Sequence, residues 1–239
     1  MSERGTELRE AIMLPGLLCD KRLWAEQSKG LVGSALLRTP DLTTCESIAA
    51  MAEGVLDQAP KRFALAGFSM GGCVALEVVA RAPERVCRLA LLSTSPWGVL
   101  PAVREHYLDS IAGIEAGGLD TYLVDAFPLY VAPERAHDRA LWNIFASMAK
   151  SLGPTVAVRQ MRSLLEYSGF RCDLGRIACP TAIICGREDR RTPVAVHEEL
   201  AERIPKARLR VIERAGHFTP LEAPQAVTDA LHEWLHAPM

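Results

Sequence analysis

One serine of this chain has neighbours that could make it a nucleophile. Ser69 lies in the stretch GFSMGG, directly after the apolar run RFALA and before an apolar helical pattern. This G-x-S-x-G pattern is typical of a tight turn between a strand and a helix, where only small flanking residues permit the close approach of the backbone. The N-terminus of the helix would direct free N–H groups toward the hydroxyl. The pattern predicts nucleophilic catalysis at Ser69, with a glycine-rich turn capped by a serine as the alternative.

A serine nucleophile needs a base to take its proton and a carboxylate to orient that base. Asp189 follows the apolar run TAIIC, and His217 follows the last strand-like run, in the sequence AGHF. Both would lie on loops at the carboxyl ends of strands, at the same edge of a parallel sheet as Ser69. Taken separately, Asp189 could cap the next helix or pair with neighbouring arginines, and a single histidine is often structural. Taken together, the three residues predict a catalytic triad.

The same chemistry requires two N–H donors for the oxyanion that forms on the attacked carbonyl group. One is the backbone N–H that follows the nucleophile, which belongs to Met70. The other comes from a loop after an early strand, and the sequence MLPGLL ends the first predicted strand at the required place. We therefore expect the N–H groups of Leu17 and Met70 to form the oxyanion hole.

The elements that would position these loops alternate between short apolar runs and longer amphipathic runs. Such alternation is typical of a parallel sheet covered by helices. The predicted strands cover residues 9–14, 34–38, 62–67, 86–93, 181–186 and 208–212, and the predicted helices cover 45–58, 70–82, 194–203 and 222–236. The expected fold class is α/β, with a mostly parallel six-stranded sheet and helices on both faces.

The alternation is interrupted once, by about 80 residues without a convincing strand between Ser95 and Cys179. Helical patterns in this stretch cover 102–115, 135–150 and 155–167. We interpret the stretch as an insertion between two strands of the sheet. The predicted organisation is an α/β core formed by residues 1–95 and 179–239, with a helical lid formed by residues 96–178.

These motifs resemble the α/β-hydrolase superfamily along nearly the whole chain. The similarity lies in GFSMGG, in the acid loop GREDRRTP, in the base loop AGHFTPLEAP and in the first-strand segment LPGLL, and it is greatest to small capped bacterial esterase-like members. The resemblance implies Ser69 as nucleophile, Asp189 as orienting acid and His217 as base. Two departures stand out. Pro15 replaces the usual histidine of the oxyanion loop, and the predicted strands lack the two N-terminal antiparallel strands common in the family.

The composition excludes several other classes of protein. The chain has 239 residues, of which 49% are hydrophobic and 23% charged, with a formal net charge of −2, so it carries no basic field for nucleic acid or for a membrane surface. No apolar run reaches the ~18 residues of a membrane span, and the polar N-terminus lacks the apolar segment of a secretory signal. Seven cysteines without a C-x-x-C pair fit reduced, buried thiols. We therefore expect a cytoplasmic protein.

Two further features have less specific interpretations. The sequence HEWLH, from His232 to His236, matches the H-E-x-x-H pattern of zinc proteases, but it leaves no third ligand downstream, and the apolar residues around it indicate a terminal helix packed on the sheet. No metal site is predicted. Arg187, Arg190 and Arg191 cluster beside the acid loop. They could attract an anionic substrate or a carrier protein, although a solvated surface is the preferred interpretation.

The expected activity is hydrolysis of a small carboxylic ester through an acyl-enzyme intermediate, without a metal or organic cofactor. The same triad could instead open a lactone, cleave a thioester, hydrolyse a carbon–carbon bond or form a peroxyacid, and the lid would decide among these reactions. The alternative from another class is a small-molecule receptor on a hydrolase scaffold, which often lacks a triad member, whereas none is missing here. The expected partner is the small ester itself. The acyl group, the leaving group and the oligomeric state are left open.

Overall fold

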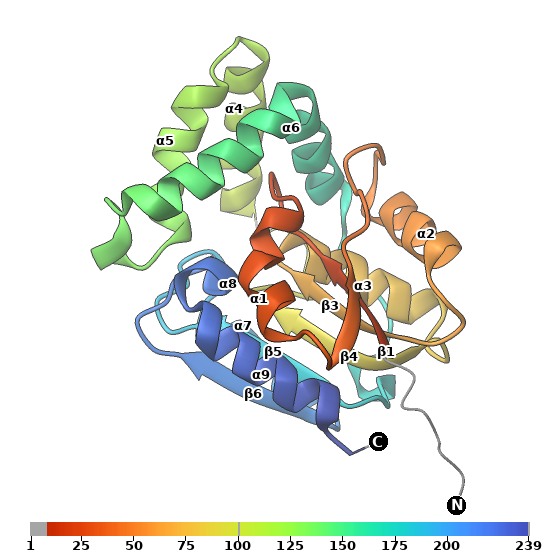
Figure 1. Ribbon diagram of the computed structural model, residues 1–239. Helices are drawn as coiled ribbons and strands as arrows, with labels where there is room; N and C mark the ends of the chain where they lie inside the picture. Colours follow the sequence, from red (N-terminus) through yellow and green to blue (C-terminus); the bar gives the residue numbers. More distant parts are fainter. Residues whose placement is uncertain (1–8, 100, 239) are drawn as a thin grey trace, which may run out of the picture.

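The computed structural model describes residues 9–99 and 101–238, and this part of the chain contains one sheet of six strands (Figure 1). The strands are β1 (Arg9–Leu14), β2 (Ala35–Arg38), β3 (Phe63–Phe68), β4 (Val86–Leu92), β5 (Thr181–Gly186) and β6 (Ala207–Ile212). Their order is β2-β1-β3-β4-β5-β6, and every neighbouring pair is parallel. The predicted α/β class is confirmed, and the sheet is entirely rather than mostly parallel.

The burial of the strands follows from their place in the sheet. All six residues of β3 are buried, as expected for a central parallel strand that is covered by helices on both faces and therefore consists of apolar and small residues. The edge strand β6 instead alternates, with Arg208 and Arg210 exposed between partly buried neighbours. The strand that leads into Ser69 is therefore enclosed by the core along its whole length.

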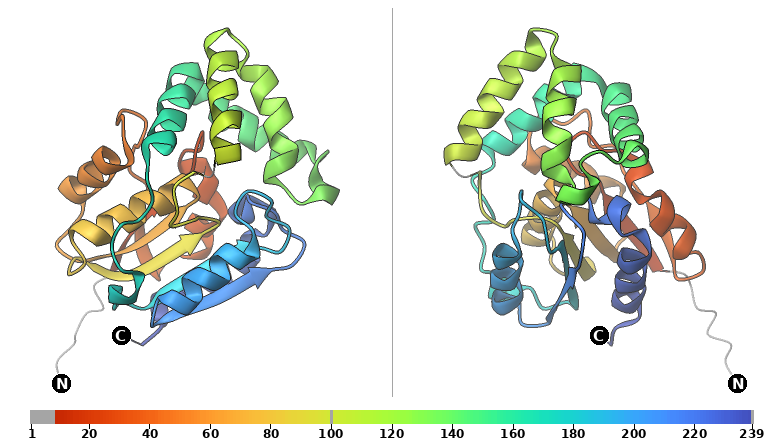
Figure 2. Two further views of the ribbon diagram at one scale, coloured as in Figure 1. Left: turned by 180° about the vertical axis from the view of Figure 1, so that it is seen from behind. Right: turned by 90° about the vertical axis from the view of Figure 1, so that its left-hand side faces the viewer.

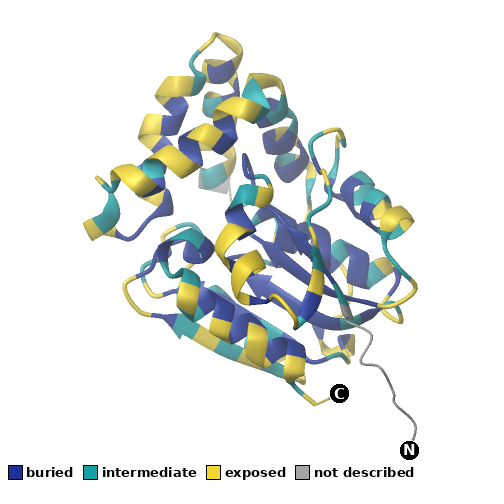
Figure 3. Cartoon of the chain, viewed as in Figure 1, coloured by how far each residue is buried: buried dark blue, intermediate teal, exposed yellow. Residues whose placement is uncertain are grey.

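Helices cover both faces of the sheet. One face carries α1 (Ala25–Gly30) and α9 (Pro224–His236), and the other carries α2 (Ile48–Gln58), α3 (Met70–Arg81) and α7 (Val194–Arg203). The right-hand view of Figure 2 shows α7 and α9 on opposite sides of the strands. Figure 3 shows the buried sides of these helices facing the sheet. In α9, Val227, Leu231 and Trp234 are buried at helical spacing, which places one apolar face on the strands.

The direction of winding reverses at β1, whose neighbours in the sheet are β2 and β3. In open parallel sheets, ligands bind at such a switch point, in the crevice outside the carboxyl ends of the strands. The loop after β1 contains Leu17, and the turn after β3 contains Ser69. The topology therefore places two of the predicted functional segments side by side.

The residues between β4 and β5 form a helical insertion over the carboxyl edge of the sheet. It contains α4 (Pro101–Glu115), α5 (Leu119–Tyr130) and α6 (Arg139–Glu166), which lie at the top of Figure 1. The 28-residue α6 is broken at Gly153, with φ 81° and ψ 175°, directly before Pro154. Glycine adopts a positive φ without strain, and proline cannot continue the helical hydrogen bonding. No helix in the described residues is long and apolar enough to cross a lipid bilayer.

The sequence patterns predict neither α1 nor α5. The six residues of α1 are too few to show a helical period, and α5 contains Pro128 near its end. Both helices form through tertiary packing, which overrides local propensity. In α5, Leu123, Phe127 and Tyr130 are buried, and the helix packs against α4 and α6. The shorter helical turns are η1 (Lys21–Trp24), η2 (Pro133–Arg135), η3 (Leu174–Arg176) and α8 (Thr219–Glu222).

Candidate active site

Ser69 lies at the turn between β3 and α3 in a strained backbone conformation. Its φ of 52° and ψ of −116° fall in a region that non-glycine residues rarely adopt, at a cost of about 1–3 kcal/mol. A Cβ atom on Gly67 would lie 2.2 Å from the carbonyl oxygen of Gly71, and one on Gly71 would lie 2.4 Å from that of Leu14. These contacts explain both glycines of the G-x-S-x-G pattern. The Ser69 side chain makes no capping hydrogen bond to α3, so its hydroxyl is available to another partner.

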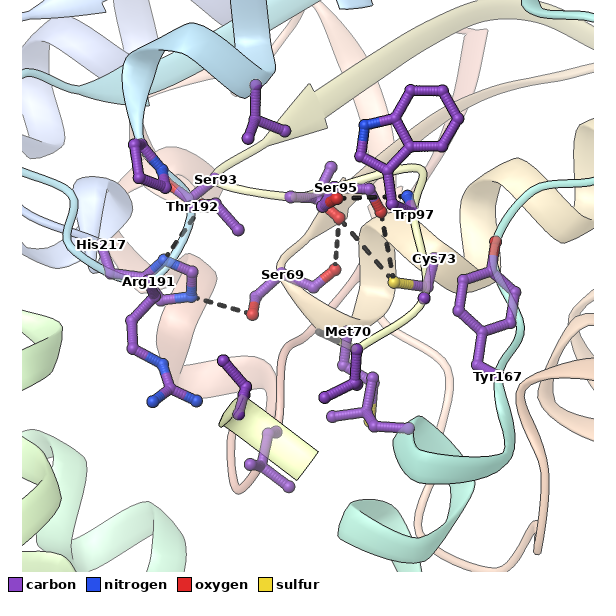
Figure 4. A pocket seen from close by; sticks show the side chains of 18 of the residues that line it. Ser69, Met70, Cys73, Ser93, Ser95, Trp97, Tyr167, Arg191, Thr192 and His217 are labelled. Atoms are coloured by element: carbon purple, nitrogen blue, oxygen red, sulfur yellow. Dashed lines mark hydrogen bonds between the residues drawn. The ribbon is translucent and has the colours of Figure 1, made fainter. Parts of the chain in front are cut away.

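That partner is His217, which also joins the serine to a carboxylate. Its Nε2 lies 2.9 Å from Ser69 Oγ (Figure 4), and its Nδ1 lies 2.9 Å from Asp189 Oδ2 and 3.0 Å from Oδ1. His217 and Asp189 are only 2% and 4% exposed, so water competes little for these bonds. Because the carboxylate accepts the Nδ1 proton, the lone pair of Nε2 faces the hydroxyl and can take its proton.

The Asp189 carboxylate is oriented by the loop that follows it. Its Oδ1 accepts hydrogen bonds from the backbone N–H groups of Arg191 at 2.8 Å and Thr192 at 2.9 Å, and its Oδ2 accepts one from the Thr192 hydroxyl at 2.8 Å. Burial alone would raise the pKa of Asp189, but the charge of His217 and the hydrogen bonds from His217 and Thr192 lower that pKa below its usual value. The carboxylate is therefore charged at neutral pH and holds the His217 ring in place through Nδ1.

The loop of His217 is tied to the helical insertion by a buried carboxyl group. Glu222 Oε1 accepts the N–H of the residue before His217 at 3.0 Å, and its Oε2 accepts the N–H of Ala132 at 2.7 Å. A backbone bond of 2.9 Å from the N–H of Phe218 to the carbonyl of Tyr130 joins the same two segments. Burial raises the pKa of Glu222 above its usual value, although these N–H groups oppose the shift. The position of His217 thus depends on the end of α5 as well as on β6.

Two backbone N–H groups beside Ser69 are free to donate to an oxyanion. Leu17 and Met70 line the same cavity as Ser69, and within the described residues neither N–H has a hydrogen-bond partner. The loop of Leu17 is braced by its next residue, because Leu18 has a φ of 56° and donates its N–H to Gln160 Oε1 at 2.9 Å. Gln160 belongs to α6 and is 1% exposed. The sequence analysis does not identify Gln160, since its surroundings, AVRQMRSLL, are those of any amphipathic helix.

His197 is a second residue that the sequence analysis does not identify, and it contacts the segment directly after β4. His197 is fully buried in α7, and its Nε2 accepts the N–H of Thr94 at 3.1 Å. The Thr94 hydroxyl in turn donates to the carbonyl oxygen of Ser69 at 2.8 Å. Burial lowers the pKa of His197 to about 4, so its imidazole is neutral at physiological pH and keeps the lone pair that this contact requires.

The Ser69 hydroxyl faces a cavity of about 230 Å³. This volume lies below the usual range of drug-sized pockets and suits a small substrate. Figure 4 shows Ser69 in the middle of the cavity wall, with His217 and Arg191 on one side and Trp97 and Tyr167 on the other. Four aromatic residues of the insertion line the cavity, namely Trp97, Tyr107, Tyr130 and Tyr167. The insertion therefore forms much of the wall opposite the sheet edge.

Of the other residues singled out in the sequence analysis, some lie at the surface and some line the cavity. His232 and His236 stack on the exposed side of α9 with ring centroids 4.3 Å apart, and no three metal-ligating side chains converge in the part of the chain that the structure describes. Arg187 is exposed and pairs with Glu213 at 2.9 Å. Arg191, in contrast, lines the cavity. The arginine cluster of the sequence is thus not one surface patch.

Comparison with known proteins agrees with this architecture. Residues 12–230 match the model of the alpha/beta hydrolase family. A pimeloyl-(acyl-carrier protein) methyl ester esterase from Nitrosomonas europaea is 28% identical over 190 residues, covering 75% of this chain and 74% of that protein. One from Chromobacterium violaceum is 30% identical over 174 residues, covering 71% and 68%. A solved esterase from Thermogutta terrifontis superposes with a TM-score of 0.85 at 23% identity, covering 98% of this chain and 92% of that one.

Proposed function

This chain belongs to the alpha/beta hydrolase family, and from that premise we propose that it hydrolyses a small carboxylic ester through an acyl-enzyme intermediate. The observation that carries the proposal is the continuous row of hydrogen bonds from Asp189 through His217 to Ser69. It ends on a strained serine in the wall of a small cavity. Relatives that are named as methyl ester esterases support a small leaving alcohol.

In the acylation step, Ser69 Oγ attacks the carbonyl carbon of the ester while His217 Nε2 takes the hydroxyl proton. The negative charge that develops on the carbonyl oxygen accepts hydrogen bonds from the N–H groups of Leu17 and Met70. The bond to the alcohol oxygen then breaks, and the alcohol leaves with the proton from His217. Asp189 remains ionised throughout, because it stabilises the imidazolium without taking a proton from it.

In the deacylation step, a water molecule takes the place of the alcohol. His217 Nε2 removes a proton from the water, whose oxygen attacks the acyl carbon and forms a second oxyanion in the same hole. The bond to Ser69 Oγ breaks, and the serine recovers its proton from His217. The carboxylic acid product leaves. All proton transfers use this chain's own groups and water.

Labelling with a fluorophosphonate and assay of short methyl esters test this proposal together. We expect wild-type protein to bind one equivalent of the probe and to release acid and methanol from the esters. Ser69→Ala should lose labelling and at least about 10⁴-fold of kcat/KM, because removal of a triad member disables the whole unit. Ser168→Ala changes an exposed serine whose partner is Arg171, and this control should behave as wild type.

Three results would contradict the proposal. Undiminished turnover in Ser69→Ala would exclude Ser69 as nucleophile. A wild-type protein that binds esters without releasing acid would favour the receptor alternative. Rapid cleavage of a carbon–carbon bond or a lactone, with slow cleavage of every methyl ester, would keep the triad but assign it to another reaction.

A further inference from the structure

Arg191 places a cation without a carboxylate partner in the wall of the cavity. Its guanidinium carbon lies 5.5 Å from the centroid of the Tyr107 ring and 5.1 Å from that of Tyr130. Within the described residues, its guanidinium makes one hydrogen bond, from Nη2 to the Tyr107 hydroxyl at 2.9 Å. A guanidinium has five N–H donors. Those of Nε and Nη1 therefore have no protein acceptor here, although the side chain is half-buried.

Other arginines that are shielded from solvent in this molecule donate to carbonyl or carboxylate oxygens of the protein. Arg85 donates to three backbone carbonyl oxygens at 2.8–3.0 Å. The buried Arg88 donates to the carbonyl oxygens of Trp234 and Ala237. Arg135 pairs with Asp138 at 2.8 Å and also binds a carbonyl oxygen. Burial of a charge is costly unless the charge is paired. Arg191 differs from these structural arginines because its guanidinium donates to a tyrosine hydroxyl rather than to a carbonyl or carboxylate oxygen, and because it lines the cavity.

The surroundings of Arg191 contain no neutralising acid. Among the described residues that line the cavity, none is acidic, whereas Arg190 and Arg191 are both basic. The nearest carboxylate along the chain belongs to Asp189. It already forms hydrogen bonds with His217 Nδ1 and with the backbone N–H groups of Arg191 and Thr192. The cavity therefore carries positive charge that no carboxylate in its lining balances.

The cation also lies within reach of the reacting groups. The Tyr130 ring that packs on Arg191 is 5.5 Å, centroid to centroid, from the His217 ring, so a single aromatic ring separates the guanidinium from the base. Figure 4 shows Arg191 on the same side of Ser69 as His217, and all three residues line the cavity. A small molecule with its carbonyl carbon at Ser69 can thus extend to the guanidinium.

We propose that Arg191 binds a free carboxylate of the substrate, so that the ester hydrolysed here carries a negative charge at its other end. A planar guanidinium with an open edge matches a carboxylate through two parallel hydrogen bonds. The two tyrosine rings hold that edge in place and shield it from water, which strengthens the charge interaction. This inference rests on the proposed ester hydrolysis and specifies its substrate class.

The direct test compares charged and neutral esters on the wild-type protein. Monomethyl esters of dicarboxylic acids, from succinate to pimelate, carry the charge on the acyl side, and O-acyl glycolates carry it on the alcohol side. Each is paired with the uncharged methyl ester or alkyl ester of similar length. We expect at least one charged substrate to exceed its neutral counterpart at least tenfold in kcat/KM. The series in which this occurs shows whether Arg191 binds a carboxylate on the acyl side or on the alcohol side of the ester.

Variants assign the preference to Arg191. Arg191→Met keeps the length of the side chain but removes its charge, and it should reduce the charged-to-neutral ratio of kcat/KM at least tenfold. Arg191→Lys keeps the charge without the planar edge and should retain part of the ratio. Arg187→Met removes an exposed arginine from the same loop, where it pairs with Glu213, and should leave the ratio as in wild type.

Each result tests either the role of Arg191 or the proposed ester hydrolysis. Neutral esters that are always the better substrates, or a preference for charged esters that persists in Arg191→Met, would overturn the role of Arg191 while ester hydrolysis stands. If the wild-type protein hydrolyses no ester at all, the proposed function itself is wrong. If Arg191→Met does not fold, two measurements on the wild-type protein test the proposal instead. They are the charged-to-neutral ratios of kcat/KM and the competitive inhibition of neutral ester hydrolysis by adipate. Absence of both the charged-ester preference and this inhibition would refute the proposal.

Discussion

The sheet edge and the helical insertion face each other across one cavity, but they hold their side chains in different ways. At the sheet edge, backbone segments approach so closely that a Cβ atom on Gly186 would lie 2.1 Å from the carbonyl oxygen of Ala215. In the insertion, a Cβ atom on Gly113 or Gly153 would meet nothing within 4 Å. Close backbone packing fixes the positions of Ser69, Asp189 and His217, whereas in the insertion it is confined to places such as Gly98 and Gly118, where a Cβ atom would lie 2.8 Å from a carbonyl oxygen.

Side-chain hydrogen bonds join the two regions both beside the candidate site and at the surface. Gln160 in α6 accepts the N–H of Leu18, and Glu222 accepts the N–H of Ala132. On the surface, Arg22 donates to the Ser147 hydroxyl at 2.6 Å. The closer backbone packing of the sheet edge suggests a division of roles between the two regions. In this division the sheet edge performs the proposed chemistry, and the insertion selects the substrate through residues such as Tyr107 and Tyr130.

The strongest test of the sheet edge is Asp189→Asn. The variant keeps the shape of the acid loop but loses the charge and the correct tautomer of His217, so kcat should fall by about 10³–10⁴-fold. The control is Glu188→Gln, the neighbouring carboxyl, which should remain active. Normal turnover in Asp189→Asn would assign the orienting acid to another residue.

A pair of glycine substitutions compares the rigidity of the two regions directly. Gly186→Ala should lower the free energy of unfolding by more than about 3 kcal/mol, since its methyl group has no space against Ala215. Gly113→Ala, on the exposed side of α4, should raise the free energy of unfolding by about 0.5–1 kcal/mol through helix propensity. Urea denaturation of both variants measures the contrast. Equal effects would mean that the two regions do not differ in packing.

The buried His197 predicts a loss of stability in acid. Its pKa falls from 6.5 to about 4 on folding, so the unfolded chain binds a proton at a pH where the folded protein does not. This residue's contribution is fully present above pH 6.5 and is lost as the pH falls from 6.5 to 4, by about 3 kcal/mol in all. Denaturation at pH 7 and at pH 4.5 should show a smaller difference in His197→Gln than in wild type. An identical difference in both would show that His197 does not titrate in this way.

The bond between Gln160 and Leu18 offers the finest test of how the insertion affects chemistry. Gln160→Ala should lower kcat by on the order of tenfold, because it loosens the loop that carries one oxyanion donor without removing the donor. KM should change less, and the affinity for a trifluoromethyl ketone, which mimics the tetrahedral intermediate, should fall in parallel with kcat. The exposed Gln225→Ala is the control. A fall in thermal stability with kcat unchanged would limit Gln160 to a structural role.

Local patterns in the sequence were sufficient for the strands and for the loops at their ends. Each apolar run that leads to a functional loop, such as RFALA before Ser69 and TAIIC before Asp189, is a strand in the structure. Local patterns were insufficient for α5, whose residues become helical only through packing on α4 and α6. They were also insufficient for Gln160 and His197, since each acts on a segment far away in the sequence.

The sequence by itself determined the fold class and the three residues proposed as nucleophile, acid and base. The reason is that a parallel sheet sends the carboxyl ends of all its strands to one edge, so residues that follow strands must meet there. The surroundings of these residues were decided by the tertiary structure alone. Arg187 and Arg191 lie four residues apart in one basic loop, yet one pairs with Glu213 at the surface and the other lies between two tyrosine rings in the cavity. Which arginine lines the cavity depends on α4 and α5, which supply the two tyrosine rings, and no local pattern encodes their packing.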